Sequence, residues 1–191
     1  MLLWLIGRMF FNCHNFINAL TLAAILSKKK IRAKVGDLFQ IPIDMSRVSY
    51  GQVAENKSGV LRIITFNRIF TIRDNPTIEE ILDAEIVLLT DTMDAKIYNG
   101  DWKVVGNASV RANLPIPKFK FGLNPVYITD YGAKRKCVAT QEETDKLDFQ
   151  FSAAPIRIQN AMQAHFGVKE WDADFDKLTF QYCFQKSLIE L

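Results

Sequence analysis

Apolar, β-rich runs broken by polar turns recur along most of the chain after residue 36, although the first of them, over residues 37–43, alternates only loosely. Runs rich in β-branched and aromatic residues, separated by polar or glycine-containing turns, are typical of strands. The predicted fold class is mainly β: a curled antiparallel sheet or partly open barrel with one main C-terminal helix, at the margin of α+β. We predict strands over residues 37–43, 48–55, 59–72, 84–91, 125–129 and 134–140.

Single residues within these runs predict strand ends and irregularities. Pro42 has no backbone N–H and belongs at a strand end or on a sheet edge. Gly51 inside a strand indicates a bulge or a close backbone approach. Tyr50 and Gln52 share one face by alternation, and we expect a kink near Asn67 in the longest run.

Turn and cap residues predict the remaining elements. Residues 75–76 (Asn-Pro) favour a helix start, with Asn75 as the cap and proline in the first helical position. Residues 99–100 (Asn-Gly) lie between apolar runs and favour a hairpin with a type I′ turn. Residues 152–167 have helical spacing, with Ser152 as a candidate cap and Gly167 as the stop.

Residues 1–27 are largely apolar, with polar residues every three or four places that a helix would carry as one stripe. Three interpretations stay open: an extension upstream of a later translation start, a membrane-surface or membrane-spanning helix, and a cleaved signal peptide. A central arginine such as Arg8 costs ~2.5 to 3.5 kcal/mol on insertion. We expect an N-terminal extension over residues 1–30 and a single β-rich domain over residues 31–191. We expect it in the cytoplasm, with membrane contact only through residues 1–27.

Charge and composition narrow the classes of partner. The chain has 191 residues, of which 49% are hydrophobic, enough for a substantial core. The net charge is +3, yet from residue 31 onward the chain contains 20 basic and 21 acidic residues and is nearly neutral. A nucleic-acid partner requires a basic face that neutralises phosphates, so we expect none.

Cysteine and histidine offer few metal ligands. Cys13, Cys137 and Cys183 are far apart and lack ligand spacing, which favours free thiols in a reducing compartment. His14 and His165 are the only histidines, and His14 lies in the N-terminal extension. We therefore expect no cofactor and no histidine-based metal site, and a carboxylate-only metal site stays open.

An acidic run and a histidine resemble parts of a calcium site and a catalytic site, but each is explained more simply as a structural feature. Residues 172–176 form a DxDxD run like the first half of a calcium loop, yet Lys177 and Cys183 occupy the positions of the required glycine and glutamate. A solvated acidic turn fits better. His165 could act as a general base, but at a helix end it more simply binds the last carbonyls or packs against the sheet. We assign no catalytic residue.

Aromatic and basic residues are candidates for binding or packing. Trp102, Trp171 and Tyr50 could anchor an interface, because Trp and Tyr are enriched in hot spots, or they could belong to the core. The basic run over residues 134–136 favours a solvated strand edge. Cys137 and Cys183 lie in apolar settings typical of packed thiols.

The order of these features resembles one known family, the bacterial immunity protein 26 family. Its members open with Gly-Asp and a strand ending in Ile-Pro, continue with a Tyr-Gly strand, and later carry Gly-x-Trp near Gly-Asn. The resemblance covers residues 34–107. The matching positions are Gly36, Asp37, Ile41, Pro42, Tyr50, Gly51, Gly100, Trp102, Gly106 and Asn107.

This resemblance implies a protein of polymorphic toxin loci that binds a cognate protein toxin and neutralises it. Such a protector needs no catalytic residue, and we expect binding rather than catalysis. Two alternatives remain. One is a small phosphotriesterase-like hydrolase, since some relatives carry that label; a metal-dependent enzyme of this kind uses several ligands, of which the body supplies one histidine. The other is a membrane-attached binding module that uses residues 1–27.

Overall fold

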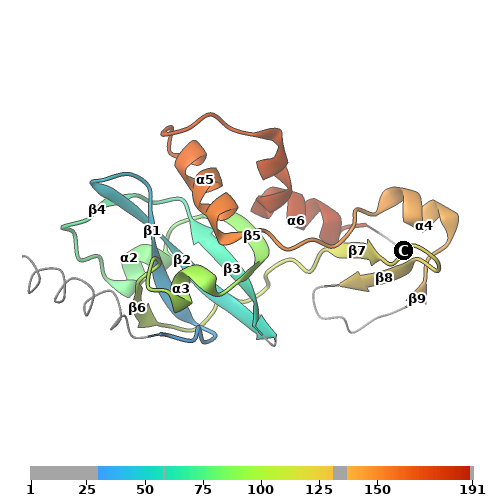
Figure 1. The fold of residues 1–191 in the computed structure, drawn as a ribbon, viewed down its shortest axis with the longest axis horizontal. Helices are drawn as coiled ribbons and strands as arrows, with labels where there is room; N and C mark the ends of the chain where they lie inside the picture. The colour runs from blue at the N-terminus through green and yellow to red at the C-terminus, as the bar shows by residue number, and fades with distance from the viewer. Residues whose placement is uncertain (1–29, 58, 131–136, 190–191) are drawn as a thin grey trace, which may run out of the picture.

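The main sheet is antiparallel, with strand order β5-β3-β2-β1-β6 and a short β4 paired with β2 (Figure 1). The structure is a computed structural model that describes residues 30–57, 59–130 and 137–189. A mainly β fold with C-terminal helices is confirmed, and the sheets do not close into a barrel. The strands are β1 (Asp37–Pro42), β2 (Arg47–Lys57), β3 (Val60–Phe66), β4 (Phe70–Thr71), β5 (Ile86–Met93) and β6 (Val104–Asn107).

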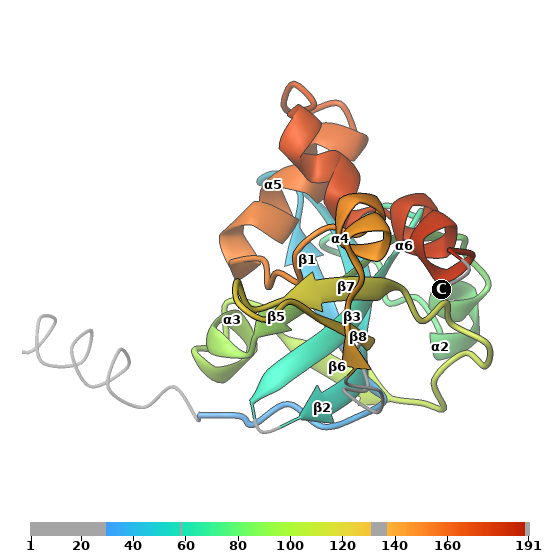
Figure 2. The ribbon, with the colours of Figure 1, turned by 90° about the vertical axis from the view of Figure 1, so that its right-hand side faces the viewer.

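A smaller antiparallel sheet lies at one end of the long axis, with strand order β7-β8-β9 (Figure 1). Figure 2 looks onto this end, with β7 and β8 in front of the main sheet. Helix α4 (Gln141–Lys146) follows β9. The strands are β7 (Lys118–Phe121), β8 (Tyr127–Asp130) and β9 (Cys137–Val138). The predicted strand over residues 134–140 is thus confirmed in part, and residues 131–136 lie outside the described chain.

Each face of the main sheet packs against helices, because alternate side chains of every strand point to opposite faces. On one face, Phe39 and Ile63 join Ile158 of α5 (Pro155–His165) and Leu178 of the 3₁₀ helix η1 (Ala173–Leu178) in one buried cluster. On the other, Tyr50 and Leu89 pack with Ile81 of α2 (Ile78–Leu82) and Cys183 of α6 (Phe180–Ser187). Both faces are therefore buried, and α5 is the predicted C-terminal helix.

The hairpin predicted at Asn99-Gly100 is wrong. Residues Ala95–Tyr98 form the short helix α3, with Asn99 as its C-cap. Gly100 follows with φ +75°, the left-handed conformation that ends many helices. An Asn-Gly pair satisfies either structure, and the burial of Ile97 in the core favours the helix.

Two predicted helix caps lie at different residues. The cap of α2 is Thr77 rather than Asn75, because Thr77 and Glu80 form a capping box: Glu80 N–H donates to Thr77 Oγ1 (3.2 Å) and Thr77 N–H to Glu80 Oε2 (2.8 Å). The cap of α5 is Ala154 rather than Ser152, and Pro155 occupies the first turn. Proline there needs no N–H partner.

The predicted irregularities of the strands are confirmed. The long run breaks at Asn67, between the end of β3 and the start of β4. Gly51 marks a close approach, while the bulge of β2 lies further on, between Val53 and Glu55. Residues 1–27 lie outside the described chain. Within the described ranges, no helix has the length and apolar character needed to cross a membrane.

Candidate functional site

Gly36, Asp37 and Asn107 join the start of β1 to the end of β6. Asn107 Nδ2 donates to Asp37 Oδ1 (2.9 Å) and to the Val35 carbonyl (3.0 Å). Gly36 has φ +88°, and a Cβ there would lie 2.5 Å from the Ala108 carbonyl oxygen. Glycine is thus required on both conformational and steric grounds. These motif residues close a corner of the sheet.

Phe39, Gly51 and Trp102 pack in the core. The rings of Phe39 and Trp102 are stacked, with centroids 5.1 Å apart and an interplanar angle of 9°. Gly51 pairs with Phe39 across β1 and β2, and a Cβ on Gly51 would lie 2.6 Å from Phe39 Cζ. Trp102 is 1% exposed, and its indole N–H donates to Gln159 Oε1 of α5 at 3.4 Å. Trp102 is therefore a core residue rather than a surface anchor.

The other motif positions are structural as well. Ile41 is fully buried, and Pro42 is the last residue of β1, as predicted. Gly100 ends α3, and a Cβ on Gly106 would meet Ile78 Cδ1 at 3.1 Å. The motif therefore specifies how the sheet and its helices pack, and it leaves the composition of the outer surface unspecified.

Tyr50 differs from the other motif positions, because it reaches a pocket as well as the core. The pocket has a volume of about 340 Å³ and lies between α2, the segment before it, and the sheet edge formed by β1 and β6. Tyr50 is 2% exposed, packs edge-on against Phe70, and accepts a hydrogen bond from Gln40 Nε2 at 3.2 Å. The pocket lining includes Gln40, Asn75, Ile78, Lys103 and Val105. Sequence reasoning selected Tyr50 and missed these residues, which come from three separate segments and share no motif.

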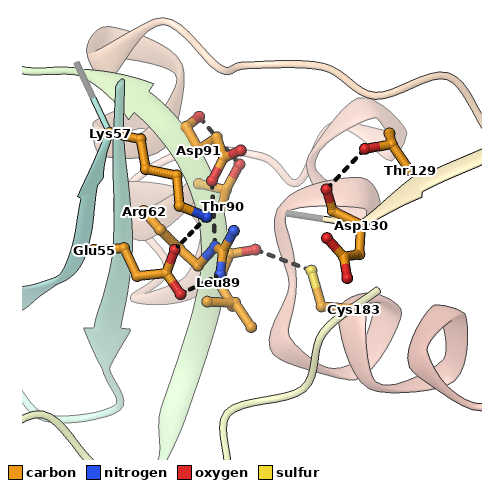
Figure 3. A network of polar contacts seen from close by, with 9 residues as sticks. All are labelled: Glu55, Lys57, Arg62, Leu89, Thr90, Asp91, Thr129, Asp130 and Cys183. Carbon is orange, nitrogen blue, oxygen red and sulfur yellow. Dashed lines mark hydrogen bonds and ion pairs between the residues drawn. The ribbon is translucent and has the colours of Figure 1, made fainter. Parts of the chain in front are cut away.

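A charged cluster joins β2, β3 and β5, with Arg62 and Asp91 buried and the partners on β2 open to solvent (Figure 3). Arg62 is 6% exposed, and it binds Glu55 at 2.8 Å and Asp91 at 3.4 Å. Glu55 also pairs with Lys57 at 3.0 Å. Burial raises the pKa of Asp91 to about 6, and the Arg62 charge opposes that rise. The cluster holds the three strands together.

His165 lies at the end of α5, where its Nε2 is 2.8 Å from Asn67 Oδ1. Its ring packs edge-on against Phe166, and burial lowers its pKa. The contact connects the end of α5 to the break after β3. His165 thus lies beside the sheet, one of the placements expected for it.

The acidic turn over residues 172–176 is held by its own capping contacts. Asp172 accepts a hydrogen bond from Asp174 N–H (2.9 Å) and caps η1. Asp174 pairs with Arg157 (3.0 Å), and Asp176 accepts from the indole of Trp171 (2.8 Å). Within the ranges that the structure describes, no group of three or more His, Cys, Asp or Glu residues could hold a metal ion.

The two described cysteines are free thiols. Cys183 is fully buried and donates to the Leu89 carbonyl oxygen at 3.0 Å, as expected for a packed thiol. Cys137 is half-buried in β9. Cys13, His14 and the basic run over residues 134–136 lie outside the described chain.

These features define a small β-rich protein whose sequence motif lies mostly in its interior. The family model of Immunity protein 26 matches residues 34–127, which confirms the resemblance seen in the sequence. The matched segment runs from just before β1 to the first residue of β8. No curated protein and no solved structure matches the chain.

Proposed function

We propose that this chain binds a cognate protein toxin in the cytoplasm and neutralises it by one-to-one contact. The observation that carries the proposal is the match of residues 34–127 to an immunity protein family. The family name, Immunity protein, indicates protection against a toxin. An immunity protein of this kind has a protein toxin as its binding partner. The free thiols Cys137 and Cys183 are compatible with a reducing compartment.

The packing of the motif supports a role in presenting a surface. Interactions such as Phe39 with Trp102 and Asp37 with Asn107 hold the main sheet in one arrangement. A preorganised scaffold loses little conformational entropy on association, which favours tight binding. A stable complex needs about 800 Å² of surface on each partner, and only a few anchors within it. Surface residues can therefore vary with the toxin while the motif stays the same.

The proposal is tested by capture of the toxin from the native host. Tagged full-length protein is purified, and the bound proteins and the N-terminus of the chain itself are identified by mass spectrometry. We expect a toxin-like protein in near-equal molar amount, and we expect its removal to leave the chain folded. A protein that returns alone from cells that produce the toxin would contradict the proposal. The N-terminal mass also decides among the three interpretations of residues 1–27.

A further inference from the structure

The pocket beside Tyr50 lies next to an irregularity in β6. The pairing of β6 with β1 shifts between Leu38 and Phe39, which face Gly106 and Val104, so that Val105 is the additional residue. Val104 packs against the core cluster on the opposite face of the sheet, whereas Val105 is 41% exposed and lies in the lining of this pocket. Bulges of this kind occur at sheet edges and beside functional sites, where they redirect a side chain.

Two polar groups in the pocket, the Tyr50 hydroxyl and the Lys103 ammonium, are donors that the described part of the fold leaves available. Gln40 donates to the Tyr50 hydroxyl oxygen, so the hydroxyl hydrogen of this almost fully buried tyrosine is free to bind an acceptor. The Lys103 ammonium makes no hydrogen bond or ion pair with any residue of the described ranges. Lys103 is also the one charged residue among the described residues that line the pocket.

Several charged groups around other hollows of the surface are already engaged. In the groove between η1 and the start of α5, Arg157 pairs with Asp174 (3.0 Å). In the hollow beside the β2–β3 hairpin, Arg62 and Lys57 both bind Glu55. The Tyr50 pocket thus combines a buried hydroxyl donor, an unengaged cation and an apolar wall that includes Ile78.

We propose that this pocket receives a glutamate or aspartate side chain of the toxin, paired with Lys103 and hydrogen-bonded by the Tyr50 hydroxyl. The inference rests on the proposed function and names the partner chemistry. A carboxylate fits because both groups donate and the lining carries a positive charge, and hydrogen bonds to an ionised acceptor are the stronger kind. The pocket opens beside the exposed Val105, so the rest of the partner would lie over the β6 edge.

The carboxylate chemistry is tested on the protein alone with a peptide probe. The full chain, labelled with nitrogen-15, is titrated to millimolar concentration with acetyl-Val-Glu-Val-amide and with the matching glutamine peptide. We expect the glutamate peptide to shift the amide signals of Tyr50, Lys103 and Val105. Replacing the lysine by methionine in Lys103→Met should weaken this binding by about tenfold or more, whereas Lys177→Met, near the opposite sheet edge at η1, should not change it.

Several results would overturn the inference. These are equal binding of the glutamine peptide, shifts confined to other surfaces, no shift at all, or unchanged binding by Lys103→Met. Shifts at β6 that grow with protein concentration before peptide is added would show that a second copy of the chain occupies the site instead. The variant Tyr50→Phe, checked for an unchanged fold by its spectrum, should weaken binding as well.

A second titration uses the captured toxin and separates the two proposals. If wild type binds the toxin and Lys103→Met binds about tenfold or more weakly, the pocket inference is supported. If both bind equally, the pocket inference fails and the proposed function stands. If the wild-type protein captures no toxin while the glutamate peptide still occupies the pocket, the proposed function fails and the carboxylate chemistry of the pocket stands.

Discussion

Trp102 lies parallel to Phe39, with the ring centroids 5.1 Å apart, and Gly51 meets the same phenylalanine across the neighbouring strand. Trp102 follows α3, Phe39 is in β1 and Gly51 is in β2. Two family-motif residues thus hold one core ring between three segments of chain. The motif residues are therefore those that the packing of the core requires. The motif does not identify the residues that contact a partner.

Replacing Trp102 by alanine should lower the free energy of unfolding by about 3 to 5 kcal/mol, because it leaves a large cavity beside Phe39. Urea unfolding followed by circular dichroism measures the loss. Trp171→Ala is the matched control, since Trp171 is 41% exposed and should cost far less. Equal losses in the two variants would show that Trp102 does not support the core.

Gly51→Ala should lower the free energy of unfolding by at least about 2 kcal/mol. The new methyl group would lie 2.6 Å from Phe39 Cζ and 2.9 Å from the Ile64 carbonyl oxygen, and the backbone oxygen cannot move away freely. Gly59→Ala is the control, because its new methyl group would meet no atom within 4 Å. The φ of +92° at Gly59 alone should lower the free energy of unfolding by about 1 kcal/mol. A smaller loss at Gly51 than at Gly59 would contradict the close-approach interpretation.

Asp91 should make stability depend on pH between about 4 and 6. Burial raises its folded-state pKa to about 6 from an ordinary value of 3.8, so the folded protein binds the proton more tightly than the unfolded chain. Its contribution is full below pH 4 and is lost as pH rises through 6, by about 2 to 3 kcal/mol. The difference in unfolding free energy between wild type and Asp91→Asn, measured from pH 4 to 7, should therefore shift in favour of Asp91→Asn as pH rises. A flat difference would contradict the buried position of Asp91.

The chain after the family match should be required for folding. Ile158 and Met162 of α5 and Cys183 of α6 are fully buried, and they fill the cores on the two faces of the main sheet. A chain that ends at Tyr127 would expose both cores to water. We expect it to lack a cooperative thermal transition and a dispersed amide spectrum. A cooperatively folded truncated protein would show that residues 34–127 form a self-sufficient unit.

The main strands could be predicted from runs of β-rich residues between turns, and α5 from the helical spacing of its apolar residues. The run over residues 37–43 and the helix ending before Gly167 both lie close to their predicted positions. The short elements were harder, since one local signal fits two structures. Asn99-Gly100 ends a helix instead of turning a hairpin, and Thr140, within a predicted strand, instead forms with Glu143 the capping box that begins α4.

The candidate site could be predicted only in part. Tyr50 stood out as an aromatic residue in a family motif, but its role depends on Gln40, Asn75 and Lys103. These residues are brought together by the pairing of β1 with β2 and β6 and by the position of α2. No local sequence pattern encodes that proximity, so it required the folded structure.

The most direct test of the account titrates the captured toxin with purified wild-type protein and follows the remaining toxin activity. Neutralisation by binding predicts a linear fall that ends at one equivalent of protein, with no further loss over time. Complete loss of activity at a small fraction of an equivalent would show turnover. That result would contradict one-to-one binding and favour an enzymatic mechanism.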